Sequence, residues 1–460
     1  MKADLTRSTF RPERHYSGVR MQQGRVQLDA DWNEHVDILA HLGRTAHADL
    51  IGACGVPKEG GGFEVSADPD GDLLLTAGRL YVDGILCELD ATAVPLSAVT
   101  EGTATVPTLV VDGLAFGLHQ WIELAAPGVG PFRARVTAVD QANHRLSFAP
   151  ALSPTELAGL DGAAAATLRR LVGYTVQPHL PAPPDATAGD PATPPVLDLS
   201  DGTFLAYVDV WERHVTALED GGIREIALGG PDTATRTQTA WQLRLDRLGD
   251  TDLAVDCDSL PGWDAIVPGT TGRLAARAHP ETTAGDLCTI PPGAGYRRLE
   301  NQLYRVEVHE AGGLGSASFK WSRENGSVVV GWTGQTGERL SVTDLGRDAV
   351  LGFAAGDWVE LTDDAHELGG TPGTMVKLKK PDAGDLLIDS TTASGSVDLD
   401  DFPVSPTIRR WDDPAGIRPI EVPGSNDGWL LLEDGVEVRF EDGDYRVGDH
   451  WLIPARTDDG

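Results

Sequence analysis

The chain contains one four-residue pattern twice, Trp121-Ile122-Glu123-Leu124 and Trp358-Val359-Glu360-Leu361. Apolar residues alternate in both copies, which is the period-two pattern of a β-strand. Further alternating segments and glycine-rich turns surround the pattern within residues 105–150 and 349–402. We interpret these segments as two copies of one repeat, and a barrel of about four to six strands fits their length. Both tryptophans are then expected in a core.

Alternating segments elsewhere extend the β interpretation. Residues 80–82 and 85–89 alternate on either side of Asp83-Gly84, and this dipeptide is a strong signal for a tight hairpin turn. Residues 233–248 fit a short helix or a strand almost equally well. Three consecutive antiparallel strands are expected at 304–309, 318–322 and 328–332, with Asn325-Gly326 as the turn between the last two, and a further strand at 204–211.

One sustained helical pattern covers about residues 29–50. Its apolar residues recur every three or four positions and form one stripe: Leu28, Trp32, Val36, Leu39, Gly43, Ala46 and Leu50. Such a stripe is typical of an amphipathic helix. Asp29 or Asp31 can cap its start and Gly52 can end it. We therefore predict a helix whose stripe faces a core.

These patterns together predict a mainly β protein of several small antiparallel barrel or sandwich modules with one N-terminal amphipathic helix. The proline-rich loop at 178–195 excludes a helix or a central strand, and residues 257–295 form a second irregular loop. Both loops belong to the central β domain. The expected division is an N-terminal segment with the helix (1–55), a hairpin region (56–104), the first barrel (105–152), the central domain (153–348), the second barrel (349–402) and a C-terminal β segment (403–460).

The chain is acidic, with 37 Lys and Arg against 70 Asp and Glu and a formal net charge of −33. Such a surface repels phosphate groups, so we expect no nucleic-acid partner. The sequence has no window of about 20 apolar residues, so no membrane span is expected. The N-terminal residues lack the apolar core of a secretory signal, which favours synthesis in the cytoplasm. The four cysteines lack C-x-x-C spacing and are interpreted as buried free thiols: Cys54, Cys87, Cys257 and Cys288.

Motifs for catalysis and for cofactor binding are absent from the sequence. There is no G-x-S-x-G nucleophile motif and no phosphate-binding loop, so we predict no catalytic residue and no cofactor. The acidic run at 68–72 is interpreted as a solvated turn and not as a cation site. His35, His41 and His47 recur every six residues, which spreads them around a helix and excludes a shared metal ion.

Two further residues, His366 and Trp263, are candidates for a site. His366 lies close to Asp363, Asp364 and Glu367, where an acidic surface loop is favoured over a metal or acid–base site. Trp263, in Pro261-Gly262-Trp263, is the best candidate for an exposed ring that stacks on a sugar, although a loop anchor is favoured. We predict no metal site.

Four segments resemble an uncharacterised bacterial family of accessory proteins from phage-tail-like contractile injection system gene clusters. They are residues 16–34, which begin Tyr16-Ser17-Gly18-Val19-Arg20, and the segments Trp211-Glu212-Arg213-His214-Val215, Phe319-Lys320-Trp321-Ser322-Arg323-Glu324-Asn325-Gly326 and Pro454-Ala455-Arg456. The resemblance thus spans nearly the whole chain. Some relatives carry a C-terminal right-handed β-helix, which has no counterpart in this sequence.

The resemblance implies a non-catalytic structural or accessory component of an injection particle, with other subunits of that particle as partners. Attachment at the baseplate or exterior and association with the tube both stay open, and such a particle would be released by lysis. The alternatives are a cargo effector or polysaccharide-acting enzyme delivered by the particle, and a carbohydrate-binding module whose partner is a surface glycan.

The segment before the predicted helix allows two interpretations. Gly18 and Gly24 bracket polar residues that could cap the helix and pack it onto the β modules. Alternatively, this segment and the start of the helix form a surface for a partner protein. The candidate docking residues are Tyr16, Arg20, Gln22, Gln23, Arg25 and Trp32.

Overall fold

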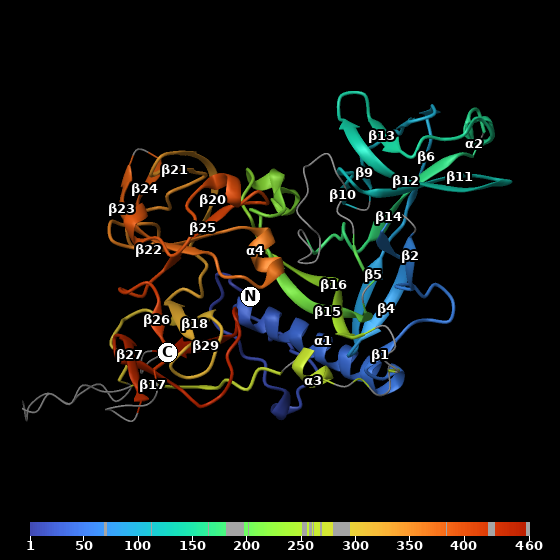
Figure 1. Cartoon of the computed structure of the whole chain (residues 1–460). Helices are drawn as coiled ribbons and strands as arrows, with labels where there is room; N and C mark the ends of the chain where they lie inside the picture. The colour runs from blue at the N-terminus through green and yellow to red at the C-terminus, as the bar shows by residue number, and fades with distance from the viewer. Residues whose placement is uncertain are drawn as a thin grey trace, which may run out of the picture. The chain divides into compact units, whose positions relative to one another are not determined.

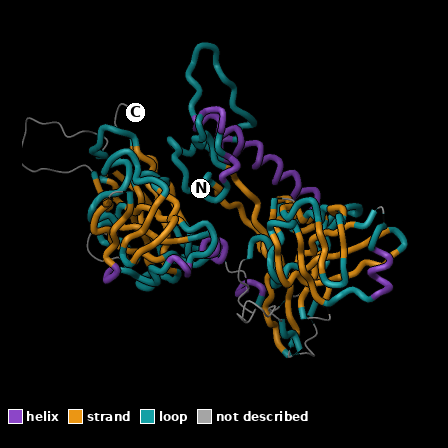
Figure 2. Tube along the Cα trace, turned by 90° about the horizontal axis from the view of Figure 1, so that it is seen from above, coloured by secondary structure: helices purple, strands orange, loops and turns teal. Residues whose placement is uncertain are grey.

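The protein is mainly β, with small antiparallel sheets and one long N-terminal helix, as predicted (Figures 1 and 2). The computed structural model describes residues 1–456 except 69–70, 112, 164, 181–196, 201, 251–254, 257–259, 261, 267–268, 279–294, 383 and 422–427. Most of the two predicted loops, 178–195 and 257–295, lies outside the described residues. The chain forms two compact units, the first of residues 1–42, 213–238 and 263–460 and the second of residues 43–212 and 239–262.

The second unit contains a nine-stranded antiparallel sheet. Its path runs β2-β3-β14-β11-β12-β13-β8-β7, and β6 also pairs with β14. Leu96 N, just after β6, donates to Ala166 O, and Ser97 N, just before β7, donates to Thr105 O. The bent segment 93–99, which contains β6 and β7, therefore joins β14 to β8. Together with β14, β11, β12, β13 and β8 it forms a closed barrel of six strands, in which the segment counts as one. The strands are β2 (Val65–Asp68), β3 (Asp72–Leu75), β6 (Ala93–Pro95), β7 (Ala98–Val99), β8 (Thr103–Thr105), β11 (Trp121–Ala126), β12 (Val129–Asp140), β13 (Arg145–Ala149) and β14 (Thr167–Gly173).

The first unit contains a closed six-stranded barrel (Figure 1). Its order is β20-β21-β24-β23-β22-β25. The strands are β20 (Val329–Thr336), β21 (Arg339–Val342), β22 (Trp358–Thr362), β23 (Thr374–Asp382), β24 (Asp385–Asp389) and β25 (Thr407–Trp411), and α4 (Asp364–Gly369) follows β22. One cluster of buried side chains fills this barrel, including Val359, Leu361 and Ile388.

The two barrels have the same strand order. The path from β14 through β11, β12, β13 and β8 to the segment 93–99 corresponds to the path from β25 through β22, β23, β24 and β21 to β20. β20 also bends between partners, because Val329–Gly331 pair with β25 and Trp332–Thr336 with β21. Each barrel includes more of the chain than the predicted segment, 105–152 or 349–402, because some of its strands come from outside that segment. A closed barrel needs every edge paired, and the local pattern did not indicate which outer strands supply those pairs.

The repeated tetrapeptides occupy equivalent positions, at the start of β11 and of β22. Their second and fourth residues point into the barrel cores, whereas the tryptophans belong to neither core cluster. Trp121 is buried on the other face of its strand, and Trp358 is only half-buried. The predicted burial is therefore confirmed for Trp121, although outside the barrel core, and wrong for Trp358. A period of two shows which residues of a strand share a face. Because the protein covers both faces of these two strands, the period does not show which face belongs to the barrel core.

Asp72 in the second unit is a buried carboxylate with several partners. It accepts hydrogen bonds from Trp121 Nε1 (2.8 Å), Thr175 Oγ1 (2.7 Å) and the Leu73 amide (2.9 Å). The Arg135 guanidinium lies 3.4 Å from this carboxylate and 4.5 Å above the Trp121 ring. The prediction of a solvated turn is therefore wrong at Asp72, because buried donors surround it.

The predicted hairpin at Asp83-Gly84 is confirmed. β4 (Gly78–Val82) and β5 (Ile85–Leu89) pair in register, and both turn residues have positive φ, 47° and 77°. β1 (Cys54–Gly55) pairs with β4. β9 (Val110–Val111) and β10 (Leu114–Ala115) form a second small sheet, and α2 (Pro154–Leu160) precedes β14. Cys87 is buried as predicted, but Cys54 is exposed.

Two further sheets complete the first unit and share one core. The expectation that residues 318–322 and 328–332 form a hairpin was wrong, because β19 pairs with β18 and β26 while β20 enters the barrel. Asn325 and Gly326 adopt positive φ as a tight turn does, but the chain then passes between sheets. The first sheet has the order β26-β19-β18-β29 and the second β17-β28-β27, with β17 (Leu274–Ala278), β18 (Gln302–Glu310), β19 (Ser318–Ser322), β26 (Arg418–Pro419), β27 (Leu430–Glu433), β28 (Val436–Phe440) and β29 (His450–Ala455).

Three elements contribute residues to both units. They are α1 (Asp29–Ile51) and the paired strands β15 (Thr203–Val215) and β16 (Arg236–Gly249). Residues 233–248, which fitted a helix or a strand, are therefore mostly strand. α3 (Trp263–Ile266) is a single short turn, and Trp263 is exposed. None of the helices in the described part has the length and hydropathy that a membrane-spanning helix requires.

Candidate docking surface

The first residues of the chain are fixed by side chains from far later in the sequence. Asn325 Nδ2 donates to the carbonyl oxygens of Met1 (3.0 Å) and Ala3 (2.8 Å), and Ala3 is buried. Arg456 donates to the carbonyl oxygen of Thr6 (2.6 Å). Both donors belong to segments that carry the family resemblance. These segments therefore serve to fix the N-terminal residues.

A buried group of charges lies beside these residues. The Glu307 carboxylate is 2.6 Å from Arg305 Nε and 3.4 Å from both Lys2 Nζ and Lys320 Nζ. Burial alone would raise the pKa of Glu307, but the three cations outweigh burial and keep it well below its usual value. Lys320 Nζ is also 2.5 Å from Glu360. Burial would raise the pKa of Glu360 as well, and Lys320 and Lys2 lower it to about 2. Both carboxylates are therefore ionised, and each depends on its cations.

The Glu360 carboxylate has the same kind of surroundings as Asp72 in the other barrel. It accepts a hydrogen bond from Trp411 Nε1 (2.9 Å), and Lys320 Nζ lies 4.6 Å from the centre of that ring. In each unit, a buried carboxylate binds an indole N–H, and a cation paired with the carboxylate lies over the same indole. Neither group was predicted from the sequence, because the carboxylate, the indole and the cation of each group come from three different strands.

Residues 6–10 contact the first half of α1 and hold it in place, and we call these residues the clamp. The Thr6 amide and hydroxyl both donate to the Asp29 carboxylate, and Thr9 Oγ1 donates to Glu34 (2.6 Å). The rings of Phe10 and His41 are 5.7 Å apart. The contacts at Glu34 and His41 lie on the side of α1 opposite its apolar stripe, and they hold that side toward the protein.

The apolar stripe of α1 is exposed, and the prediction that it faces a core was wrong. Trp32 is 60% exposed, and Leu28, Val36 and Leu39 are between 41% and 53% exposed. The buried positions are Ala30 and Ile38, which lie on the opposite side of the helix at 100° per residue. The periodicity identified the residues that share a face correctly. The polar contacts of the clamp decide which face is covered.

An exposed segment separates the clamp from α1, and we call residues 11–28 the arm. It begins with a short 3₁₀ turn, η1 (Pro12–Arg14), and every residue except Gly18 and Val19 is exposed. The Val19 amide donates to His35 Nδ1 (3.5 Å). At its tip the Arg25 amide donates to Gln22 O (3.3 Å) in a tight turn. The Val19 contact thus ties the middle of the arm to α1, and the residues on both sides of the tip turn are exposed.

The candidate docking residues lie on the arm and on the exposed face of α1. Tyr16 is 54% exposed and Trp32 is 60% exposed. Within the described part of the chain, the side chains of the arm candidates form no hydrogen bond or ion pair with the protein. These side chains belong to Tyr16, Arg20, Gln22, Gln23 and Arg25. The interpretation of the arm as a helix cap required those donors to be used within the molecule, so the exposed geometry favours docking.

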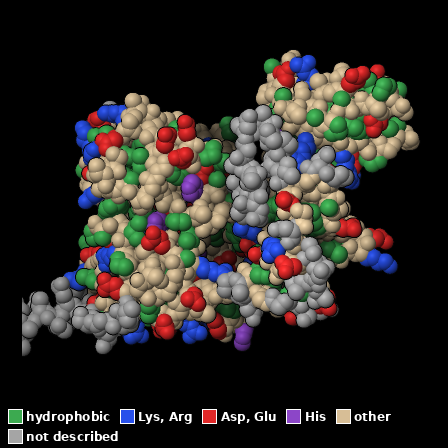
Figure 3. Space-filling view, viewed as in Figure 1, with side chains coloured by type: hydrophobic (Ala, Val, Ile, Leu, Met, Phe, Trp, Pro, Cys, Tyr) green, Lys and Arg blue, Asp and Glu red, His purple; other side chains and the backbone are tan. Residues whose placement is uncertain are grey.

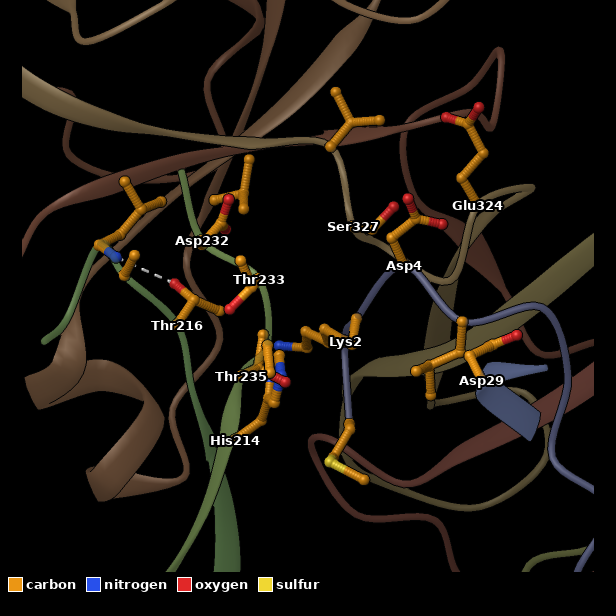
Figure 4. Close-up of a pocket in the computed structure, with 18 of the residues that line it drawn as sticks. Lys2, Asp4, Asp29, His214, Thr216, Asp232, Thr233, Thr235, Glu324 and Ser327 are labelled. Carbon is orange, nitrogen blue, oxygen red and sulfur yellow. Dashed lines mark hydrogen bonds between the residues drawn. The ribbon is translucent and has the colours of Figure 1, made fainter. Parts of the chain in front are cut away.

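A cleft of about 1540 Å³ lies beside the base of the arm, entirely within the first unit. One wall is the α1 face with Leu28, Trp32 and Val36. Figure 4 shows Lys2 extending toward the side of His214, with Asp4 on the opposite side. The cleft therefore combines an apolar wall with charged and hydroxyl-bearing side chains.

His214 in this cleft is a mostly buried imidazole. No hydrogen-bond partner within the described residues reaches its Nε2. The pKa of His214 is lowered to about 4, chiefly by burial and then by the positive charges of the N-terminus and Arg409, while Glu367 acts in the opposite direction. An ordinary histidine has a pKa of about 6.5. His214 is therefore neutral in the folded protein at neutral pH.

We expect His214 to make the protein acid-sensitive. Between pH 6.5 and pH 4 the unfolded chain binds a proton that the folded chain excludes, so stability falls as the pH falls through this window. The contribution is up to about 1.4 kcal/mol per pH unit for one proton. In His214→Gln, the slope of unfolding free energy against pH, measured by urea denaturation, should be shallower by about one proton. Slopes above pH 7 should match those of the wild type. Equal slopes for His214→Gln and wild type below pH 6.5 would contradict the assignment of this pH dependence to His214.

Other residues considered in the sequence are placed as follows. His366 Nδ1 lies 2.6 Å from Asp363, which is buried and caps α4, so this carboxylate is no part of a surface loop. His41 contacts Phe10, and His47 lies 3.2 Å from the carbonyl oxygen of Gly84. Across the described ranges, no group of three or more His, Cys, Asp or Glu side chains is arranged to hold a metal ion.

The fold and this surface define a mainly β protein with two barrels of the same strand order and an exposed N-terminal arm. The chain belongs to the family of unknown function DUF6519, whose model matches residues 1–166, 171–259 and 265–460. No curated protein and no solved structure matches the chain.

Proposed function

We propose that this protein is a non-catalytic assembly component that docks onto a protein partner through the arm and the exposed face of α1. The observation that carries the proposal is the exposure of the apolar stripe, whose residues Leu28, Trp32, Val36 and Leu39 are each more than 40% exposed. A contiguous apolar patch on a water-soluble surface marks an interaction site. Tryptophan is also enriched among the residues that dominate binding energy at interfaces.

The geometry around the stripe supports the same role. The clamp and the buried charges fix the start of α1, so the docking face is rigid before binding. A rigid face loses less conformational entropy when a partner binds. The resemblance of residues 16–34 to accessory proteins of contractile injection systems adds the class of partner. We propose a subunit of such a particle, at its baseplate or exterior or along its tube.

The test is electron microscopy and quantitative blotting of injection particles purified from cells that produce the chain. Wild-type chain should copurify with the particles, and W32D/V36D should be reduced about tenfold or more, because a buried aromatic anchor contributes about 2 kcal/mol or more at an interface. The matched control is I226D/L299D, which changes two residues that are 86% and 95% exposed elsewhere in the same unit. Particles without the wild-type chain, or equal amounts of W32D/V36D and wild type, would overturn the proposal.

A further inference from the structure

We infer that the arm binds in the cleft of a second copy of this chain. The inference rests on the proposed function, because it identifies a partner for the same surface. Residues 11–26 of the arm do not line the cleft of their own chain. They are exposed, and the cleft beside them is open. The arm of one molecule and the cleft of another are therefore both available.

Charge favours the second copy as the occupant. The arm has four basic residues, Arg11, Arg14, Arg20 and Arg25, and one acidic residue, Glu13, so its net charge is 4 − 1 = +3. The whole chain carries −33, which leaves −33 − 3 = −36 on the remainder. The arm is thus a basic segment on a strongly acidic protein. Another copy of the chain is an acidic partner that is present wherever the protein is made.

The lining of the cleft is also more acidic than basic. It has six carboxylates and four basic side chains. Lys2 is engaged by Glu307, and two of the arginines donate to backbone carbonyl oxygens of their own loop. Asp4 and Asp232 are exposed, and neither forms an ion pair with any described residue. These two carboxylates can therefore receive arginines from outside.

The apolar parts of the two surfaces also match. Met21 and Val26 flank the tip turn of the arm and are 54% and 81% exposed. The wall of the cleft presents Trp32 and Val36. Seating the tip against this wall buries apolar surface on both molecules, and each buried square ångström contributes about 25 cal/mol. Arg20 and Arg25 bracket the tip and would lie over the carboxylates at the rim.

A broad acidic patch is not evident as a competing site on the face shown in Figure 3. Acidic and basic side chains are interspersed over the β20–β25 barrel in that view. The arm and the cleft are different surfaces, so the contact is heterologous. Such contacts build closed rings or open chains and not an isologous pair. This asymmetry makes the inference testable by mixing variants.

The first measurement is the molar mass of the full chain by sedimentation over a range of concentrations. Wild type should form oligomers at about 0.1 M salt that weaken at about 1 M salt, where the Debye length falls from about 10 Å to about 3 Å. The self-association of R20E/R25E and that of D4K/D232K should each be at least about tenfold weaker than that of wild type. Matched controls with the same charge changes at exposed positions, K58E/K380E and E59K/D90K, should behave as wild type.

The decisive step is an equimolar mixture of R20E/R25E and D4K/D232K. One intact arm and one intact cleft remain in the mixture, and the reversed charges on the other arm and cleft also attract each other, so the mixture should form oligomers that neither variant forms alone. Monomeric wild type at all concentrations, oligomers that survive both pairs of changes, or a mixture that stays monomeric would overturn the inference. If wild type is monomeric yet still copurifies with injection particles, the inference fails and the proposed function stands.

Discussion

Replacing Lys320 with methionine is expected to lower the free energy of unfolding by about 3–5 kcal/mol. The Lys320 side chain is 3% exposed, and its ammonium group pairs with Glu360 at 2.5 Å and with Glu307 at 3.4 Å. Methionine preserves the packing against Trp411 but leaves Glu360 buried without its main cation. Urea denaturation followed by tryptophan fluorescence measures the loss.

Two further variants decide whether the charge is responsible. K320M/E360Q removes both charges and should recover part of the loss, because the penalty arises from the uncompensated carboxylate. K379M removes an exposed lysine paired with Glu338 and should have little effect.

The pKa of Glu360, lowered to about 2, adds a pH dependence that can be measured. Its stabilisation is present above the unfolded value of about 4.5 and is lost as pH falls toward 2, so K320M should show a weaker acid dependence. A K320M protein as stable as wild type would exclude this account.

The second large effect is expected in the other barrel, at Asp72. D72A should lower the free energy of unfolding by about 3–5 kcal/mol, because it leaves the Arg135 guanidinium buried without its carboxylate. It also leaves the Trp121 indole N–H and the Thr175 hydroxyl without their acceptor. Thermal and urea unfolding, monitored by near-ultraviolet circular dichroism, would show the loss.

The partners of Asp72 provide graded controls. W121F keeps a ring under Arg135 but removes one donor, so we expect a loss of only about 1 kcal/mol from the hydrogen bond beyond any change in packing. D140A removes a carboxylate that pairs with Arg145 at the surface and should leave stability nearly unchanged. If D72A were no less stable than D140A, the buried ion pair would have no role in holding the barrel together.

The sequence predicted local structure correctly where the backbone conformation depends on the residues of the segment itself. Asp83-Gly84 predicted its hairpin because both positions need positive φ, and the structure has it. The apolar period predicted a helix over 29–50, and α1 covers Asp29–Ile51. The repeated tetrapeptides predicted two strands, and these strands are equivalent in the two barrels.

The sequence was a poor guide to long-range pairing. Nothing in the pattern of Asn325-Gly326 distinguishes a hairpin from a crossing between two sheets, since both need the same backbone angles. The exposed side of α1 also depends on distant residues, because Thr9 donates to Glu34 on its opposite side. The candidate arm residues were identified from the sequence as a possible docking surface. The cleft was not, since it is assembled from segments hundreds of residues apart. The buried carboxylates Asp72 and Glu360 were not either, since the side chains that donate to them lie 40 to 103 residues away.

The contact between Thr6 and Arg456 has a consequence for how the protein is made. These residues are 450 positions apart, so at about 5–20 residues per second the ribosome needs roughly 20–90 s to supply the second after the first. The unit of residues 43–212 and 239–262 emerges completely before the other unit can. During most of that interval the first ten residues lack Glu307 and Asn325, and they lack Arg456 until its end. The contacts that hold the N-terminal residues in the folded protein are therefore incomplete until Arg456 has been synthesised.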